Sequence, residues 1–240
     1  MPSGAAGDTG AGASGEGAPP DWERVLEAAA RLRELIPEAV LVGGTASAVH
    51  AGHRVSYDAD HVLANLKPRF DAVLAQLEDV AGWRTARVAR PVMILGSLDG
   101  IETGVRQLIR SAPLETEELV RGGHRLCLPT RAEMLRIKAV LILKRNATRD
   151  YLDFVALANR LGDEAAVQAL GPFDALYPQD NGASALLQLQ VQLAKPLPYD
   201  LDEIGLAEYR SLDPAWHDWN AVSALCATLA ELIFVRITGE

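Results

Sequence analysis

Apolar residues recur every three or four positions in four stretches of the first 161 residues, and this spacing predicts helices. The stretches are residues 22–36, 68–80, 131–143 and 148–161. Asp21 is placed to cap the first helix, and Thr130 followed by Glu133 forms a capping box at the start of the third. The chain after residue 161 repeats the helical pattern with interruptions, and ends in an apolar helix predicted over 214–237.

Shorter apolar or alternating runs between these helices predict strands. They fall at residues 39–42, 55–63, 83–88, 91–95, 101–109 and 125–128. The pattern predicts an α+β fold, with a small mixed sheet flanked by helices and then a helical C-terminal half. Residues 21–128 form the predicted α/β core and 129–240 the helical domain. Residues 1–20, rich in Gly, Ala, Ser and Pro, are interpreted as a disordered tail.

Composition narrows the class of protein. Of 240 residues, 49% are hydrophobic and 23% charged, with no apolar run near the roughly 20 residues that span a bilayer. The first residues lack a basic segment followed by an apolar core, and Cys127 and Cys226 show no metal-ligand spacing. These features predict a cytoplasmic location and no membrane partner. A net charge of −9 argues against a surface coated in nucleic acid but allows a local basic groove.

Gly43 and Gly44 separate the strand at 39–42 from a short helix that begins at Thr45. Glycine lets the backbone approach a phosphate closely, and a helix N-terminus presents free N–H groups and the positive end of the dipole. Gly43, Gly44 and Thr45 are therefore candidates for holding a triphosphate. A tight turn between strand and helix explains the same glycines.

Asp58 and Asp60 lie two residues apart in the next strand, so both carboxylates are on one face, about 7 Å apart along the chain. Two like charges in this arrangement repel, whereas Mg²⁺ takes one or two carboxylates together with substrate phosphates. A pair of such ions can activate an attacking hydroxyl and stabilise leaving pyrophosphate. The alternative is a solvated strand end whose charges face water.

Basic residues cluster in a chain that is otherwise acidic. Residues 131–149 contain six Lys or Arg and one acidic residue, Glu133. Lys138, Lys144 and Arg145 are candidates for neutralising phosphates, with Lys144 and Arg145 placed in a turn. A solvated helix face is the alternative.

Two aspartates follow the basic cluster. Asp150 and Asp153 share a helix face, and Asp150 is placed at a helix start, where the dipole stabilises a carboxylate. Closer to the paired aspartates, Arg54 and Ser56 are candidate phosphate contacts. Arg54 could instead pair with an aspartate.

The order of these motifs carries a resemblance. Gly43-Gly44-Thr45-Ala46 followed by Arg54-Val55-Ser56-Tyr57-Asp58-Ala59-Asp60 closely resembles the signature of AbiEii-type toxin nucleotidyltransferases, within the polymerase-beta-like superfamily. The segment Lys144 to Asp153 is similar to the family's basic-Asp-aromatic-x-Asp segment. The resemblance covers about residues 39 to 160.

The resemblance implies a Mg²⁺-dependent transfer of a nucleoside monophosphate from an NTP to an acceptor. In that interpretation the catalytic residues are Asp58, Asp60, Lys144 and Asp150. The residues that hold the NTP are Gly43, Gly44, Thr45, Arg54, Ser56, Lys138 and Arg145. The acceptor implied is the 3′ end of tRNA, the biological role is that of a toxin, and the partner is a cognate antitoxin.

One expected group is missing. Polymerase-beta-like enzymes usually have a third carboxylate on a neighbouring strand, and its register here falls near Arg106 or Gln107, neither of which is an anionic base. Glu102 is the only carboxylate in that strand and is the candidate third metal ligand. Two alternatives stay open: an inert nucleotide-binding or interaction module with the same fold, and a transferase that acts on a small hydroxylated molecule.

Overall fold

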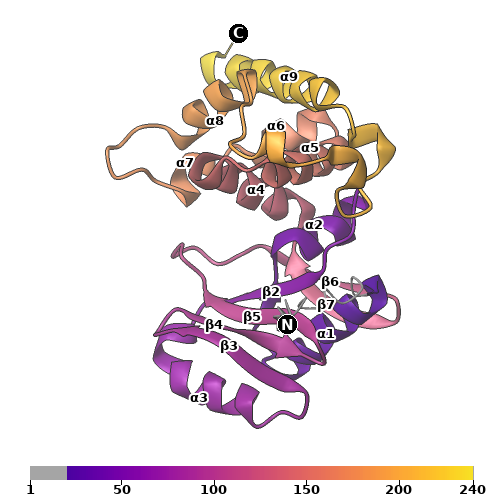
Figure 1. Ribbon diagram of the computed structural model, residues 1–240. Helices are drawn as coiled ribbons and strands as arrows, with labels where there is room; N and C mark the ends of the chain where they lie inside the picture. The colour runs from indigo at the N-terminus through magenta and orange to yellow at the C-terminus, as the bar shows by residue number, and fades with distance from the viewer. Residues whose placement is uncertain (1–20, 240) are drawn as a thin grey trace, which may run out of the picture.

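The computed structural model describes residues 21–239, which form a sheet half and a helical half (Figure 1). The predicted tail, residues 1–20, lies outside the described residues. The sheet half contains the strands and helices α1 (Trp22–Leu35) and α3 (Leu66–Glu78). Helix α2 (Gly43–Ala51) leaves the sheet and packs on the helical half, so it joins the two.

The main sheet has five strands in the order β1-β2-β5-β4-β3. Strands β2 and β5 are parallel, and the other neighbouring pairs are antiparallel. This mixed sheet and the helices after it confirm the predicted fold class. The strands are β1 (Val40–Leu41), β2 (Asp58–Leu63), β3 (Trp83–Ala89), β4 (Met93–Leu98) and β5 (Ile101–Gln107).

The two faces of the sheet differ in burial. Ala59 and Leu63 of β2 are buried and face helices α1 and α3, whereas Asp58 and Asp60 are half-buried on the opposite face. Apolar side chains of α1, α3, β4 and β5 fill the covered face, including Leu32, Phe70, Val73, Leu77, Ile94 and Val105. Burial of one face alone fixes the register of β2, because a shift by one residue would put both aspartates in this core.

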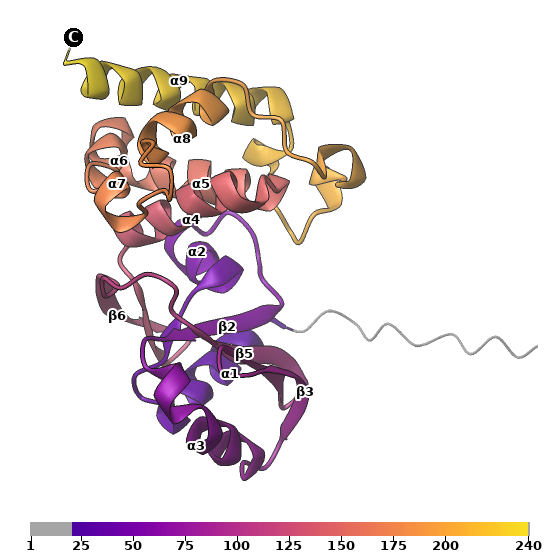
Figure 2. The ribbon, with the colours of Figure 1, turned by 90° about the vertical axis from the view of Figure 1, so that its left-hand side faces the viewer.

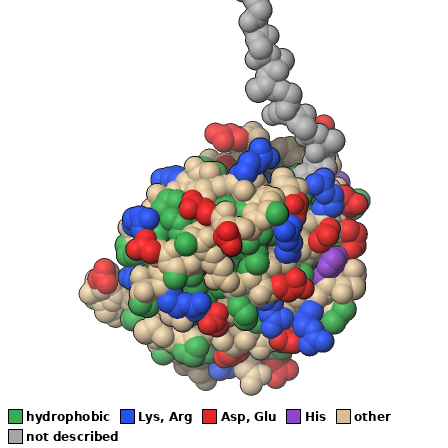
Figure 3. All heavy atoms as spheres, turned by 90° about the horizontal axis from the view of Figure 1, so that it is seen from below, with side chains coloured by type: hydrophobic (Ala, Val, Ile, Leu, Met, Phe, Trp, Pro, Cys, Tyr) green, Lys and Arg blue, Asp and Glu red, His purple; other side chains and the backbone are tan. Residues whose placement is uncertain are grey.

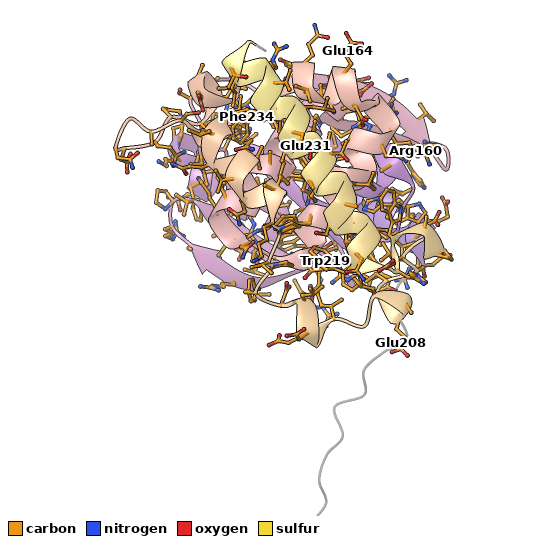
Figure 4. All side chains as sticks on the ribbon, turned by 90° about the horizontal axis from the view of Figure 1, so that it is seen from above. Arg160, Glu164, Glu208, Trp219, Glu231 and Phe234 are labelled. Carbon is orange, nitrogen blue, oxygen red and sulfur yellow. The ribbon has the colours of Figure 1, made fainter. Side chains whose placement is uncertain are left out.

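The helical half begins with the packed pair α4 (Arg131–Arg145) and α5 (Thr148–Leu161). Seen from above, α9 (Trp219–Thr238) lies across the top of this half, with Trp219 at its first turn and Glu231 exposed on it (Figure 4). The remaining helices are α6 (Asp163–Ala169), α7 (Phe173–Leu176), α8 (Ala185–Ala194) and three 3-10 turns at Leu201–Glu203, Leu206–Glu208 and Pro214–Trp216. The sequence predicts interruptions of the helical pattern at residues 177–182 and 196–198, and they lie after α7 and after α8.

Helix α9 is long and apolar enough to cross a membrane, by length and composition only, and it is the one such helix among residues 21–239. Its most apolar window has a mean hydropathy of 1.7, and only 28% of that window is buried in the chain. Phe234 and Val235 are each 45% exposed on it. At the opposite end of the molecule, acidic and basic side chains are interspersed (Figure 3).

The structure corrects two local expectations. Strand β6 (Thr116–Arg121) was not predicted; it pairs with β7 (His124–Pro129) in a separate hairpin. Its residues are mostly exposed and Glu-rich, so the alternation that marks a strand is weak. Lys144 and Arg145 end helix α4 rather than lying in a turn, since the left-handed residue that closes the helix is Asn146.

Candidate functional site

Asp58 and Asp60 lie side by side on the open face of β2, as their spacing predicts. The Ser56 hydroxyl donates a hydrogen bond of 2.6 Å to Asp58 Oδ1. The Thr45 hydroxyl donates to the backbone carbonyl of Asp58. Both hydroxyls therefore fix the position of Asp58, and the expectation that Thr45 and Ser56 contact phosphate stays a prediction.

The start of α2 favours glycine twice, at Gly43 because of its positive φ and at Gly44 because of close approach. Gly43 has φ +73°, and a Cβ added there would lie 3.6 Å from Asp60 Oδ2. A Cβ on Gly44 would lie 2.7 Å from the Arg54 guanidinium and 2.8 Å from Ser56 Oγ, closer than real Cβ atoms come. Glycine at both positions thus brings the first turn of a nine-residue helix against Asp60 and Arg54.

A fully buried carboxylate, Asp153, anchors the helical half to the site. Its Oδ1 accepts hydrogen bonds from His53 Nε2 at 2.7 Å and Arg54 Nε at 2.8 Å. Its Oδ2 accepts from Arg54 at 3.0 Å and lies 2.7 Å from Lys138 Nζ. Burial alone would raise the pKa of Asp153, but Arg54, Lys138 and His53 outweigh it and hold that pKa well below its usual range.

Asp150, also buried, holds the basic groups of α4. Arg145 donates to both of its oxygens, at 3.1 and 2.7 Å, and Lys138 Nζ lies 3.5 Å from Oδ1. Lys138 is therefore enclosed between two carboxylates and is not presented to a ligand in this arrangement. Arg145 differs, since its side chain is 40% exposed while Asp150 fixes its guanidinium. Lys144 is exposed at the end of α4.

Charged side chains from both halves of the chain act on Asp60. Burial and the neighbouring Asp58 raise the pKa of Asp60, while Arg106, Lys138 and Arg145 lower it. Arg106 Nε lies 3.8 Å from Asp60 Oδ1. The open sheet face thus places two acidic groups within the field of basic groups from β5 and α4, the electrostatic arrangement that a metal-bound triphosphate requires.

The third carboxylate is not assembled. Asp60 lies opposite Gly104 in the parallel β2–β5 pair, and Arg106 follows on the same face. A side chain at Gly104 would lie 2.4 Å from the carbonyl oxygen of Ile94. Glu102 lies opposite Asp58 in the same pair, but among residues 21–239 no three His, Cys, Asp or Glu side chains converge as a metal site, so its role as third ligand stays a prediction.

The donors present fit one divalent ion. Asp58 and Asp60 offer half-buried carboxylate oxygens on one face, and the missing side chain at Gly43 leaves space beside Asp60 Oδ2. Mg²⁺ usually combines one or two carboxylates with phosphate oxygens and waters. Two carboxylates therefore suit an ion whose coordination is completed by a triphosphate.

Two histidines lie outside the predicted metal chemistry. His61 points away from Asp58 and Asp60, is fully buried, and forms no ring hydrogen bond; burial lowers its pKa to about 4. His53 was missed as a contributor, although it binds the central aspartate of the buried cluster. No local spacing links His53 with Asp153, which lies 100 residues later, so only the fold brings them together.

Comparisons with known proteins give relatives of two kinds. No family model matches the chain. The heme uptake protein MmpL11 of Mycobacterium tuberculosis is 29% identical over 210 residues, which cover 76% of this chain. The mycolic acid-containing lipids exporter MmpL11 of Mycolicibacterium smegmatis is 32% identical over 124 residues, or 50% of this chain. The chain spans about a fifth or less of the length of these relatives, at 20% and 13%.

These relatives correct the expectation of a cytoplasmic location. They are named for uptake and export, so the absence of a signal-like N-terminus and of a 20-residue apolar run was the wrong basis for that prediction. The pattern of α9 explains part of the error. Glu231 and Arg236 interrupt its apolar sequence near the end, yet its longest apolar window still passes the length and hydropathy requirements of a span.

The similar solved structures have the fold of nucleotidyltransferases. JHP933 from Helicobacter pylori superposes with a TM-score of 0.54 at 17% identity, covering 91% of this chain and 92% of its own. An H. pylori protein described as a nucleotidyltransferase superposes with a TM-score of 0.52 at 16% identity, covering 90% and 97%. The chain therefore has a nucleotidyltransferase fold over both halves, and the AbiEii-type assignment stays a prediction.

Proposed function

We propose that this chain binds a nucleoside triphosphate with one divalent ion at Asp58 and Asp60, and transfers its nucleoside monophosphate to an acceptor hydroxyl. The observation that carries the proposal is the pair of half-buried carboxylates on one strand face, with the charge of Arg145 acting on Asp60 and the buried Asp150 holding Arg145 in place. Structural ion pairs alone do not account for a second aspartate on an open sheet face, since adjacent like charges are destabilising.

Each part of the site has a role in this proposal. Asp58 and Asp60 hold the ion, with Asp58 oriented by Ser56. When bound, the ion supplies charge neutralisation for the phosphates and orients them. The first turn of α2 offers backbone N–H groups to the triphosphate. Arg145 neutralises charge that develops on departing pyrophosphate.

Other basic residues act less directly. Lys144 is exposed beside Arg145 and is proposed to contact the outer phosphates. Lys138 is a positioning residue, because its contacts with Asp150 and Asp153 keep the two buried carboxylates aligned with Arg145 and Arg54. This assignment moves Lys138 and Arg54 from phosphate binding to support of the site.

The acceptor follows from the resemblance alone. It suggests the 3′ end of tRNA as acceptor and a cognate antitoxin as partner of a toxin. Both belong to the proposal, as does a small hydroxylated molecule as the alternative acceptor. Transfer to any of these would leave pyrophosphate as the second product, because the bond to the α-phosphate breaks as the acceptor oxygen forms its own bond.

The test is transfer of label from each α-³²P-labelled NTP, with Mg²⁺, to total tRNA or to an aminoglycoside-like acceptor. Asp58→Asn is the inactive variant, and Asp180→Asn is the control, because Asp180 is exposed and forms no ion pair in the described part of the chain. Label on an acceptor with wild type and control, reduced at least about a hundredfold in Asp58→Asn, supports transfer. Equal labelling by all three proteins would contradict it.

A second candidate is a nucleotide-binding module without turnover, and Arg106 favours it. An arginine stands near the register expected for the carboxylate and lies 3.8 Å from Asp60, and the carboxylate that β5 does carry, Glu102, lies opposite Asp58 rather than Asp60. This candidate predicts that wild type binds the metal–nucleotide complex but labels none of the acceptors. Arg106→Asp would then be the variant in which a transfer activity is gained.

A further inference from the structure

The segment between α8 and α9 runs alongside the chain that leads into β2 (Figure 2). The Val55 backbone N–H donates to the carbonyl of Arg210 at 3.0 Å. The Asp213 N–H donates to the carbonyl of His53 at 2.8 Å. This late segment of the helical half therefore borders the approach to Asp58.

Arg210 is stacked between two tyrosines at this border. Its guanidinium carbon lies 5.3 Å from the ring centre of Tyr57, the residue directly before Asp58, and 5.9 Å from that of Tyr209. Arg54 lies 5.9 Å from the same Tyr209 ring. Contact with two aromatic rings restrains the guanidinium, and a restrained guanidinium loses less freedom when it binds a phosphate with two N–H groups.

The backbone at Arg210 is strained. Arg210 and the next residue, Ser211, have φ values of 45° and 52°, in the left-handed region that side-chain-bearing residues rarely adopt. Each such residue costs on the order of 1–3 kcal/mol and persists only where the surroundings impose it. Glycine would relieve the strain, so the presence of Arg210 needs a reason beyond making the turn.

A second unpaired arginine lies nearby. Burial raises the pKa of Tyr209, whereas the charges of Arg54, Arg210 and Arg149 lower it, so all three cations act on one phenol. Arg54 is paired with Asp153. Within residues 21–239, neither Arg149 nor Arg210 lies within 4 Å of a carboxylate oxygen, although the chain is acidic overall. Arg210 thus has no carboxylate partner beside Tyr57, and Arg149 adds to the positive potential there, which favours an anion.

We propose that Arg210 and Arg149 form a second phosphate-binding subsite, which takes a phosphate of a nucleotide beside the Asp58–Asp60 site. The inference rests on the proposed function, because it assumes that nucleotides reach that site. The phosphate belongs either to the incoming NTP or to the terminal nucleotides of an acceptor strand. Tyr57 and Tyr209 hold the guanidinium of Arg210 in position and thus act as positioning residues.

Binding measured separately from transfer tests the subsite. The probes are Mg²⁺–ATP and a fluorescent single-stranded RNA of about twelve nucleotides, a length typical of single-strand sites. The variants are Arg210→Gln and Arg149→Gln. The matched control is Arg87→Gln on β3, an exposed arginine without an ion pair in the described residues. Loss of one charge-assisted phosphate contact weakens binding of the relevant probe about tenfold.

The two probes distinguish the sources of the phosphate. Weaker RNA binding with ATP affinity within twofold of wild type assigns the subsite to an acceptor strand, with a salt dependence lower by about 0.7 per lost contact. Weaker ATP binding with unchanged RNA affinity assigns it to the NTP. Both outcomes support the subsite; wild-type affinity of both variants for both probes, or no binding of either probe by wild type, overturns it.

Arg210→Gly separates binding from folding. Glycine accepts the positive φ without strain, so this variant is expected to melt no lower than wild type while it loses the same affinity as Arg210→Gln. A lower melting temperature with unchanged affinity would show that Arg210 serves structure alone. Transfer assays separate the two proposals. Full transfer and unchanged binding in both arginine variants would remove the subsite and leave the proposed function intact. Binding that depends on the arginines, without any transfer by wild type, would support the subsite and remove the proposed transfer.

Discussion

Replacement of Asp153 tests whether the buried cluster holds the two halves of the site together. Asp153→Ala removes the carboxylate that accepts from His53 and Arg54 and pairs with Lys138 at 2.7 Å. Arg54 and Lys138 keep their charges, and their side chains are only 2% and 3% exposed. Asp150 is shared with Arg145 and lies 3.5 Å from Lys138, so it compensates only part of this charge.

The expected loss is large. Removing one partner of a buried ion pair costs about 3–5 kcal/mol, because the other charge is left without compensation. For a chain of this size each kcal/mol lowers the melting temperature by about 2–4 °C, so a fall of roughly 6–20 °C is expected. Urea unfolding followed by circular dichroism gives the change in the free energy of unfolding directly.

A matched surface pair provides the control. Asp71 pairs with Arg90, but its side chain is 82% exposed. Asp71→Ala is therefore expected to lower the free energy of unfolding by no more than about 1 kcal/mol. An Asp153→Ala variant as stable as Asp71→Ala would refute the assignment of Asp153 as the anchor of the cluster.

The pH dependence of the same cluster has a definite sign. The pKa of Asp153 lies well below its usual value in the folded chain. A carboxylate with a lowered folded pKa stabilises the fold above its unfolded pKa of about 3.9, and this contribution is lost as the pH falls toward the folded value. The difference in unfolding free energy between wild type and Asp153→Ala should thus be constant above about pH 5 and shrink below pH 4.

Three further predictions concern the site and its surroundings. Arg106→Gln removes a half-exposed cation that lies 3.8 Å from Asp60 Oδ1, so calorimetry should show about tenfold tighter Mn²⁺ binding. Unchanged Mn²⁺ affinity would place the ion elsewhere. His61 has a pKa of about 4 when folded against about 6.5 unfolded. The free energy of unfolding should therefore fall by about 1.4 kcal/mol per pH unit as the pH drops from about 6.5 to 4, and His61→Met should lack this slope in urea titrations. Gly44→Ala forces a Cβ to within 2.7 Å of Arg54 and should lower the free energy of unfolding by about 1–3 kcal/mol in the same titrations. Gly205→Ala, where the nearest atom would lie 4.0 Å away, should be neutral. Equal effects of the two substitutions would contradict the close approach at Gly44.

Local patterns were sufficient for the fold. The alternation at Asp58 and Asp60 gave the correct open face, and Thr130 caps α4 by accepting from the Glu133 N–H, as the capping box predicts. Strand β6 (Thr116–Arg121) was not predicted because none of its residues is fully buried and its half-buried face holds the charged Glu117 beside Leu119, so the apolar alternation is weak. The prediction of a cytoplasmic location was wrong for a different reason, because composition does not show which proteins a chain acts with.

The site was predicted only in part, because its acidic pair is local in sequence and its basic groups are not. Spacing reveals Asp58 and Asp60, but it cannot show that Lys138 is enclosed by carboxylates. Nor can it bring Tyr57 against Arg210, which is more than 150 residues away. That contact depends on the packing of the last segment of the helical half against the chain before β2.

The most direct test of the account is whether Asp58 and Asp60 hold the metal–nucleotide complex. Mn²⁺ can be titrated into the protein with a non-hydrolysable ATP analogue, and binding followed by electron paramagnetic resonance and calorimetry. The account predicts that wild type and Asp180→Asn bind one ion together with the nucleotide, and that Asp58→Asn and Asp60→Asn each weaken it by at least about tenfold. The same affinity in all four proteins would contradict the account.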